Sequence, residues 1–128
     1  MNLLLDTVTF LWWVTGDDRL STQAASLIET PSREVFLSSV STWEIVQKNA
    51  LGKLPLPEDP ASLIPRLRED HGIAELALTE RAVLQLSRLP SLHRDPFDRM
   101  LLCQAIEHGL TVVTPDQLLR QYPVRTAW

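Results

Sequence analysis

Short apolar runs alternate with longer amphipathic stretches along the whole chain. The runs are too short for helices and end at polar, Gly or Pro residues, which is typical of buried strands. They predict strands over residues 2–5, 34–38, 110–113 and 124–126, and a further short strand inside 73–78. Because predicted helices separate these strands, we expect an α/β fold whose mainly parallel sheet is covered by helices on both faces.

The predicted helices begin at side chains that suit helix N-termini. Ser21 precedes one helix, and Asp59-Pro60 and Asp95-Pro96 each place an Asp cap before a proline at the first helical position. We expect helices over residues 9–14, 21–28, 41–49, 59–69, 79–89 and 95–107, with a helical turn after residue 116. Pro65 predicts a kink or break inside the fourth of them.

The composition is that of an ordinary globular protein. With 128 residues, 45% of them hydrophobic and 22% charged, the chain is long enough for one domain, which we expect over residues 1–128. Its single Cys excludes an internal disulfide, and no apolar run approaches the roughly 20 residues of a membrane span. The first residues lack the pattern of a signal peptide, so we expect a cytoplasmic protein.

Four carboxylates lie at the edges of the apolar segments. Asp6 and Asp116 follow the first and fourth predicted strands, and Glu44 and Asp98 lie near the starts of two predicted helices. Parallel α/β sheets place ligands beyond the carboxyl ends of their strands, so this topology brings the four acids together. Carboxylates in one pocket repel one another unless cations neutralise them. We therefore expect a metal site and chemistry on phosphates.

Oxygen ligands of this kind favour Mg²⁺ or Mn²⁺. A zinc site is not expected, because Cys103 is alone and the three His residues lack the spacing of ligands. We expect His93 to be an exposed loop side chain, with a contact to the acidic segment as the less favoured alternative. The chain also lacks the P-loop, G-x-G-x-x-G and G-x-S-x-G patterns, which argues against a nucleotide-binding loop and against acyl transfer.

Each acid also has an ordinary structural role open to it. Glu44 completes a capping box with Ser41, and Asp98 lies three residues after Asp95, where it complements the helix dipole. The two acids at strand ends can cap turns. For any single acid these roles explain the sequence as well as metal binding does. For all four together they do not, because independent caps have no reason to converge.

Hydroxyl and basic side chains accompany the acids in the sequence. Hydroxyls that can hold metal-bound waters or tune the carboxylates come from Thr7, Ser38, Ser39, Ser41 and Thr114. Candidates for holding phosphates are Lys48, Lys53, Arg94 and Arg99, although ordinary surface charge is the favoured role of each. The net charge of −4 argues against a broadly basic nucleic-acid surface, but not against a nuclease whose acidic site is bridged by cations.

With these residues in place, the chain resembles the PIN-domain family, and within it the VapC-type toxins of bacterial toxin–antitoxin pairs. The resemblance is collinear and covers essentially the whole chain. It is carried by residues 3–7 (LLLDT), 11–13 (LWW), 38–45 (SSVSTWEI), 51–57 (LGKLPLP), 93–101 (HRDPFDRML) and 113–116 (VTPD). The ordered set that includes residues 93–101 is specific, whereas any one short piece is not.

This resemblance implies a three-layer α/β/α domain and a Mg²⁺- or Mn²⁺-dependent endoribonuclease. Its acidic site corresponds to Asp6, Glu44, Asp98 and Asp116, and we expect Thr7, Ser41, Asp95, Arg99 and Thr114 around the site, Asp95 chiefly as an N-cap. We expect one cation held mainly by Asp6 and Asp98, and a second, transient one near Glu44 and Asp116. Attack by metal-activated water would leave a 5′-phosphate and a 3′-hydroxyl, and the RNA preference rests on the resemblance alone.

The resemblance also implies a homodimer and a small antitoxin that inserts a segment, often with an Arg, into the acidic groove. The RNA target is a transfer RNA or a messenger RNA. Val8 and Arg81 stand where similar toxins often have His, which bears on substrate choice or packing and not on the acids. Two alternatives stay open: a catalytically silent PIN-like binding module, and another metal-dependent phosphohydrolase.

Overall fold

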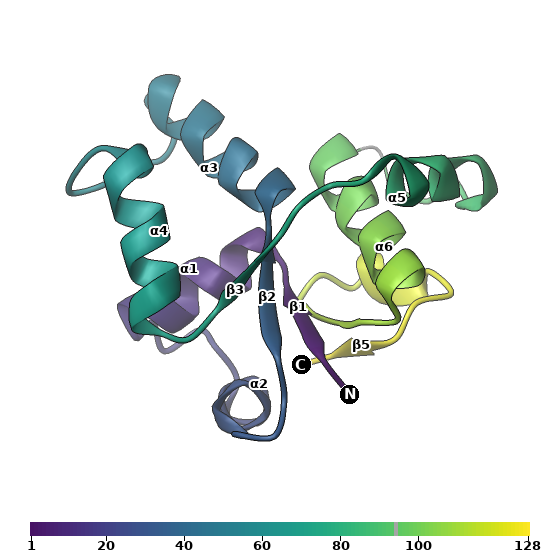
Figure 1. Ribbon diagram of the computed structural model, residues 1–128, viewed down its shortest axis with the longest axis horizontal. Coiled ribbons are helices and arrows are strands. Elements are labelled where there is room, and N and C mark those ends of the chain that lie inside the picture. Colours follow the sequence, from purple (N-terminus) through teal and green to yellow (C-terminus); the bar gives the residue numbers. More distant parts are fainter. Residues whose placement is uncertain (94) are drawn as a thin grey trace.

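A parallel sheet of five strands forms the centre of the computed structural model, which describes residues 1–93 and 95–128 (Figure 1). The strands are β1 (Leu3–Leu5), β2 (Val35–Ser38), β3 (Ala74–Leu76), β4 (Thr111–Val113) and β5 (Thr126–Ala127). They lie in the order β3-β2-β1-β4-β5, and each neighbouring pair is parallel. The predicted parallel sheet is therefore confirmed, and the first strand of the chain lies at its centre.

The helices are α1 (Thr7–Thr15), α2 (Thr22–Glu29), α3 (Ser39–Ala50), α4 (Pro60–Asp70), α5 (Glu80–Leu84) and α6 (Pro96–His108). Two short 3-10 segments follow α5 and β4, at Gln85–Arg88 and Leu119–Gln121. Ser21, Asp59 and Asp95 cap their helices as predicted, each accepting a backbone N–H with its side chain. No helix within the described residues is long and apolar enough to cross a membrane.

Helices cover both faces of the sheet, so the fold has three layers (Figure 1). On one face, Leu3 and Leu5 of β1 pack in a core cluster with Phe10 of α1 and residues of α2 and α4. On the other face, Leu4 packs with Leu101 and other residues of α6. The alternation along β1 follows from the two-residue period of a strand, since successive side chains point to opposite faces. The α/β/α architecture is confirmed.

Helix α3 begins earlier than predicted, and the prediction of a capping box formed by Ser41 and Glu44 is wrong. The N-cap is Ser38, the last residue of β2, whose hydroxyl accepts the N–H of Val40 at 2.9 Å. Strand β2 therefore runs directly into the helix, and Ser41 falls in its first turn and Glu44 in its second. Both side chains are buried and free of any capping role.

Two further helices differ in part from the predictions. Pro65 does not break α4, which continues through it to Asp70. The carbonyl that loses its partner belongs to Ala61, an exposed residue, so water can hydrogen-bond it. The helix predicted over residues 79–89 is α-helical only to Leu84 and continues as a 3-10 segment.

The register of the sheet sets the positions of the functional residues. Leu5 at the end of β1 is level with Leu37 of β2 and Val113 of β4. The residues that follow these three strand positions, Asp6, Ser38 and Thr114, consequently lie at one edge of the sheet. This carboxyl edge is where parallel α/β folds place their ligands.

Candidate metal centre

Asp6 is held by two hydrogen bonds at the point where β1 turns into α1. Its Oδ1 accepts the backbone N–H of Thr9 at 2.8 Å, which makes Asp6 the N-cap of α1. Its Oδ2 accepts the hydroxyl of Thr114 at 2.6 Å. The residue is only 4% exposed, and burial raises the pKa of its carboxyl. Capping and a place in the site are therefore compatible for the same side chain.

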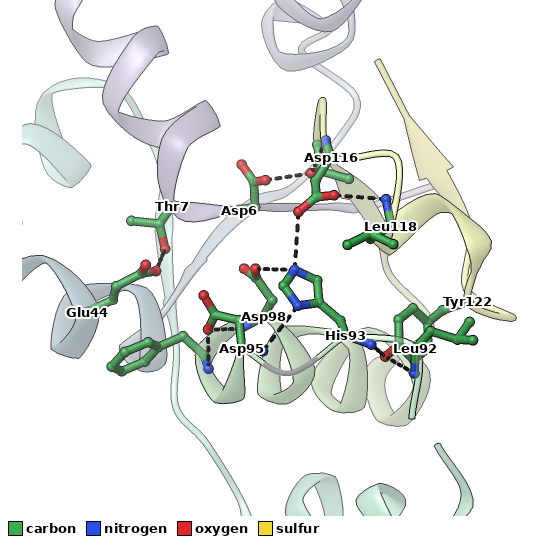
Figure 2. A network of polar contacts seen from close by, with 12 residues as sticks. Asp6, Thr7, Glu44, Leu92, His93, Asp95, Asp98, Asp116, Leu118 and Tyr122 are labelled. Atoms are coloured by element: carbon green, nitrogen blue, oxygen red, sulfur yellow. Dashed lines mark hydrogen bonds and ion pairs between the residues drawn. The ribbon is translucent and has the colours of Figure 1, made fainter. Parts of the chain in front are cut away.

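Thr114 connects Asp6 to Asp116. While its hydroxyl donates to Asp6, the same oxygen accepts the backbone N–H of Asp116 at 3.0 Å. Asp116 caps the next turn by accepting the N–H of Leu118 on Oδ1 at 2.8 Å, which leaves its Oδ2 facing the other acids (Figure 2). Thr114 is fully buried, so its position beside both carboxylates is fixed.

Glu44 projects from α3 toward the start of α1. The hydroxyl of Thr7 donates to Oε1 of Glu44 at 2.6 Å (Figure 2). The same Thr7 oxygen lies 2.9 Å from the hydroxyl oxygen of Ser41. The other carboxylate oxygen, Oε2, pairs with the ammonium of Lys48 one helical turn later. Thr7 thus contacts Glu44 directly, and Ser41 contacts Thr7.

Asp98 is a second acid of the group whose pKa is raised. Burial, followed by the negative charges of Asp95, Glu44 and Asp6, raises the pKa of its carboxyl to about 7. Its neighbour Asp95 caps α6, accepting the N–H groups of Phe97 at 2.9 Å and Asp98 at 3.3 Å. Asp95 is therefore the N-cap that we predicted, and it also contributes charge to the site.

His93 belongs to the site, and its prediction as an exposed loop residue is wrong. Its side chain is 16% exposed, and Nε2 lies 3.2 Å from Oδ2 of Asp98 and 3.4 Å from Oδ2 of Asp116 (Figure 2). The backbone N–H groups of Leu92 and His93 both donate to the hydroxyl oxygen of Tyr122, which fixes this segment. No spacing rule relates Tyr122 to His93, so sequence patterns gave no signal for the contact.

A hydrogen bond determines where the His93 ring carries its proton. The backbone N–H of Asp95 donates to Nδ1 at 3.1 Å, so Nδ1 is an acceptor and has no proton. A neutral ring must then be protonated on Nε2, which makes this nitrogen a donor to the carboxylates of Asp98 and Asp116. In this arrangement His93 bridges the two acids, and the ligands open to a metal are carboxylate oxygens.

The donor set fits a divalent cation. One carboxylate oxygen each of Asp98 and Asp116 lies beside the His93 ring, within 4.8 Å of the other and of one ring nitrogen, and Asp6 is close enough to raise the pKa of Asp98. Within the described residues, Lys48 is the one Lys or Arg that forms an ion pair with any of these acids. An excess of buried negative charge with oxygen ligands suits a hard cation and not zinc, and Cys103 is buried in the core.

The remaining basic candidates differ in position. Arg99 follows Asp98 on α6, and its Nε is buried without a hydrogen-bond partner in the described part of the chain. Lys53 is exposed beyond the end of α3, and Arg94 lies outside the described residues. Of the two positions where similar toxins often have His, Arg81 pairs with Glu107 at 3.1 Å and Val8 is half-buried on α1.

Comparisons with known proteins bear on the family and on the fold. The family model described as "PIN domain" matches residues 3–124. The chain is 30% identical over 122 residues to Ribonuclease VapC22 of Mycobacterium tuberculosis, covering 94% of this chain and 92% of that protein. Among solved structures, a chain of VapBC2 from Rickettsia felis bound to a promoter DNA fragment superimposes with a TM-score of 0.75 at 14% identity, covering 99% of this chain and 98% of that one. A chain of DNA-bound VapBC from Salmonella typhimurium gives 0.72 at 18% identity, with 99% and 97% covered.

Proposed function

Because the chain belongs to the PIN-domain family, we propose that it is the toxin of a toxin–antitoxin pair and acts as a Mg²⁺- or Mn²⁺-dependent endoribonuclease. The observation that carries this proposal is the convergence of Asp6, Glu44, Asp98 and Asp116 at the carboxyl edge of the sheet. Burial, together with repulsion from Asp95, Glu44 and Asp6, raises the pKa of Asp98 to about 7, as expected for a group of acids that a cation is needed to neutralise.

The proposed roles follow from the contacts of each side chain. Asp6, Asp98 and Asp116 offer oxygens to the cation, with Glu44 completing the acidic set. A divalent cation bound there polarises a phosphate and lowers the pKa of a bound water. Thr7, Ser41 and Thr114 orient the carboxylates, and Asp95 adds charge. Arg99 stays a candidate for contacting the substrate, supported by its buried and unpartnered Nε within the described residues.

The substrate is the least constrained part of the proposal. RNA as the substrate is supported by the 30% identity to a protein named Ribonuclease VapC22. A transfer RNA and a messenger RNA are equally compatible with an open acidic site. Hydrolysis by an activated water does not use the 2′-hydroxyl, so we expect products with a 5′-phosphate and a 3′-hydroxyl.

The proposed activity is tested by replacing acids of the site. We expect Asp6→Asn and Asp98→Asn to lose at least about a hundredfold in cleavage of RNA oligonucleotides with Mg²⁺ or Mn²⁺, because each removes a charged ligand. Asp18→Asn, at an exposed acid outside the site, is the matched control and should cleave like the wild type. Cleavage is measured beside small phosphomonoesters and beside toxicity on expression.

Two outcomes would overturn the proposal in different ways. Turnover of phosphomonoesters without RNA cleavage would indicate another metal phosphohydrolase. Absence of RNA cleavage by the wild type, with toxicity unchanged in both Asn variants, would indicate a binding module without catalysis. In both cases the fold and the acidic site would stand while the nuclease assignment failed.

We further propose that the chain binds an antitoxin partner and forms a homodimer. We also propose that it acts in the cytoplasm. The VapBC structures support a partner protein, since they match this chain in fold. The exposed apolar side chains of Trp43 and Val46 on α3 and of Val83 and Leu84 on α5 support an interface between copies. Light scattering on the isolated chain and co-purification with the product of a neighbouring gene test the two parts separately.

A further inference from the structure

Lys48 is a cation already present in the acidic site. It lies four residues after Glu44 on α3, so the two side chains are neighbours on one helix face. Its ammonium contacts Oε2 of Glu44, while Thr7 donates to Oε1 at 2.6 Å. Both oxygens of Glu44 are thereby occupied, and the side chain of Glu44 is only 7% exposed. This acid is satisfied without any metal.

The other acids do not have such a partner. Within the described residues, His93 is the one ion-pair partner of the Asp98 carboxylate, and Oδ2 of Asp116 faces the same ring. The charge of Lys48 also reaches α6, because Asp95 and Asp98 add to Glu44 in raising the pKa of the ammonium. The positive charge therefore lies on the α3 side of the site, opposite the loop that carries Asp116.

We propose that Lys48 takes the place of a second divalent cation beside Glu44, so that the site binds one divalent cation per chain through Asp6, Asp98 and Asp116. The inference rests on the proposed function in assuming that the acids bind metal. It replaces our expectation of a transient second cation near Glu44 and Asp116. A divalent cation at Glu44 would have to displace the ammonium from Oε2 or lie against it, and both are unfavourable between like charges.

This arrangement also gives Lys48 a role toward the substrate. The side chain is 46% exposed, so the ammonium can reach solvent while it contacts Glu44. A Lys is a point charge with several donors and binds phosphate oxygens without a fixed geometry. Lys48 is thus a positioning residue that holds Glu44 and offers a single positive charge where a second metal would offer two.

The test is the number of Mn²⁺ ions bound by the full chain without RNA, measured by calorimetry and by electron paramagnetic resonance up to millimolar free Mn²⁺. We expect one ion per chain in the wild type and in Lys48→Arg, which keeps the charge. We expect two in Lys48→Gln, where Glu44 loses its cation. Lys53→Gln, at an exposed Lys near the end of the same helix, is the matched control and should bind one. Circular dichroism verifies that each variant is folded.

The outcomes separate this inference from the proposed function. Two ions in the wild type, or one ion in folded Lys48→Gln, would overturn the role of Lys48 and leave the metal-dependent nuclease intact. No ion in the wild type at any concentration would overturn the metal-dependent function itself. As a second readout, Lys48→Gln should raise the KM for RNA more than it lowers kcat, since Lys48 contacts phosphate and not the reacting water.

Discussion

We expect protonation of Asp98 to control how strongly the proposed metal site binds a cation. A carboxyl with a pKa of about 7 is largely protonated at pH 6, and only the carboxylate is a good ligand. Affinity for Mn²⁺ should therefore be full above the pKa and should fall roughly tenfold per pH unit below it. Calorimetric titrations at pH 6, 7 and 8 check this expectation. An affinity that is constant over this range would contradict it.

Asp95 provides a variant that separates charge from capping. Asn is as good an N-cap as Asp, so Asp95→Asn should keep α6 while it removes one of the charges that raise the pKa of Asp98. The midpoint of the pH dependence should then move to lower pH. An unchanged midpoint would mean that the charge of Asp95 does not act on the site.

The buried hydroxyl of Thr114 is worth testing because it serves two acids. Thr114→Val keeps the shape but leaves Oδ2 of Asp6 and the N–H of Asp116 without their partner. We expect a loss of roughly 10–100-fold in Mn²⁺ affinity, typical of residues that orient metal ligands. Thr114→Ser, which keeps the hydroxyl, should retain most of the affinity. Equal affinities in the two variants would show that the hydroxyl does not position the ligands.

At the level of elements, the join between β2 and α3 determines where Glu44 points. Ser38 caps the helix through its contact with Val40, and its hydroxyl also donates to the buried amide oxygen of Gln104 on α6. Ser38→Ala removes both contacts, so it should cost about 1–3 kcal/mol in the free energy of unfolding. Denaturant titrations measure the loss, with Ser62→Ala, at an exposed residue of α4, as the control. A loss in Ser38→Ala no larger than in this control would contradict the role of the cap.

The same join shows what local sequence signals can and cannot predict. Ser21, Asp59 and Asp95 can be predicted as N-caps because each directly precedes a residue pattern typical of a helix. Residues 38–41 contain three Ser residues that could each be the N-cap of α3. Ser38 is the N-cap in the structure, where its hydroxyl also donates to Gln104, which is 66 residues away in the chain. A contact of this kind follows from the packing of α6, not from spacing. His93 was misjudged for the same reason, since Asp98 lies on the neighbouring helix but Asp116 and Tyr122 come from beyond β4.

At the level of the molecule, the order of apolar runs was sufficient for the sheet and its layers. The alternation of strands and helices predicted parallel strands but not their order. The pairing of β1 with both β2 and β4, which brings Asp6 next to Thr114, is seen only in the structure. The sequence pattern did not predict that Lys48 pairs with Glu44 inside the site, because surface charge was the favoured role of Lys48. A single domain over residues 1–128 stays our proposal, supported by one sheet that takes strands from both ends of the chain.

The central position of β1 determines when the sheet can be completed during synthesis of the chain. Asp6 directly follows β1 and Asp116 follows β4, so the two acids are far apart in the chain, and β1 completes its pairing only when β4 is available. Long-range pairing of this kind forms late, after the intervening segments exist. A partly translated chain that ends before β4 therefore lacks Asp116, and with it the complete set of four acids.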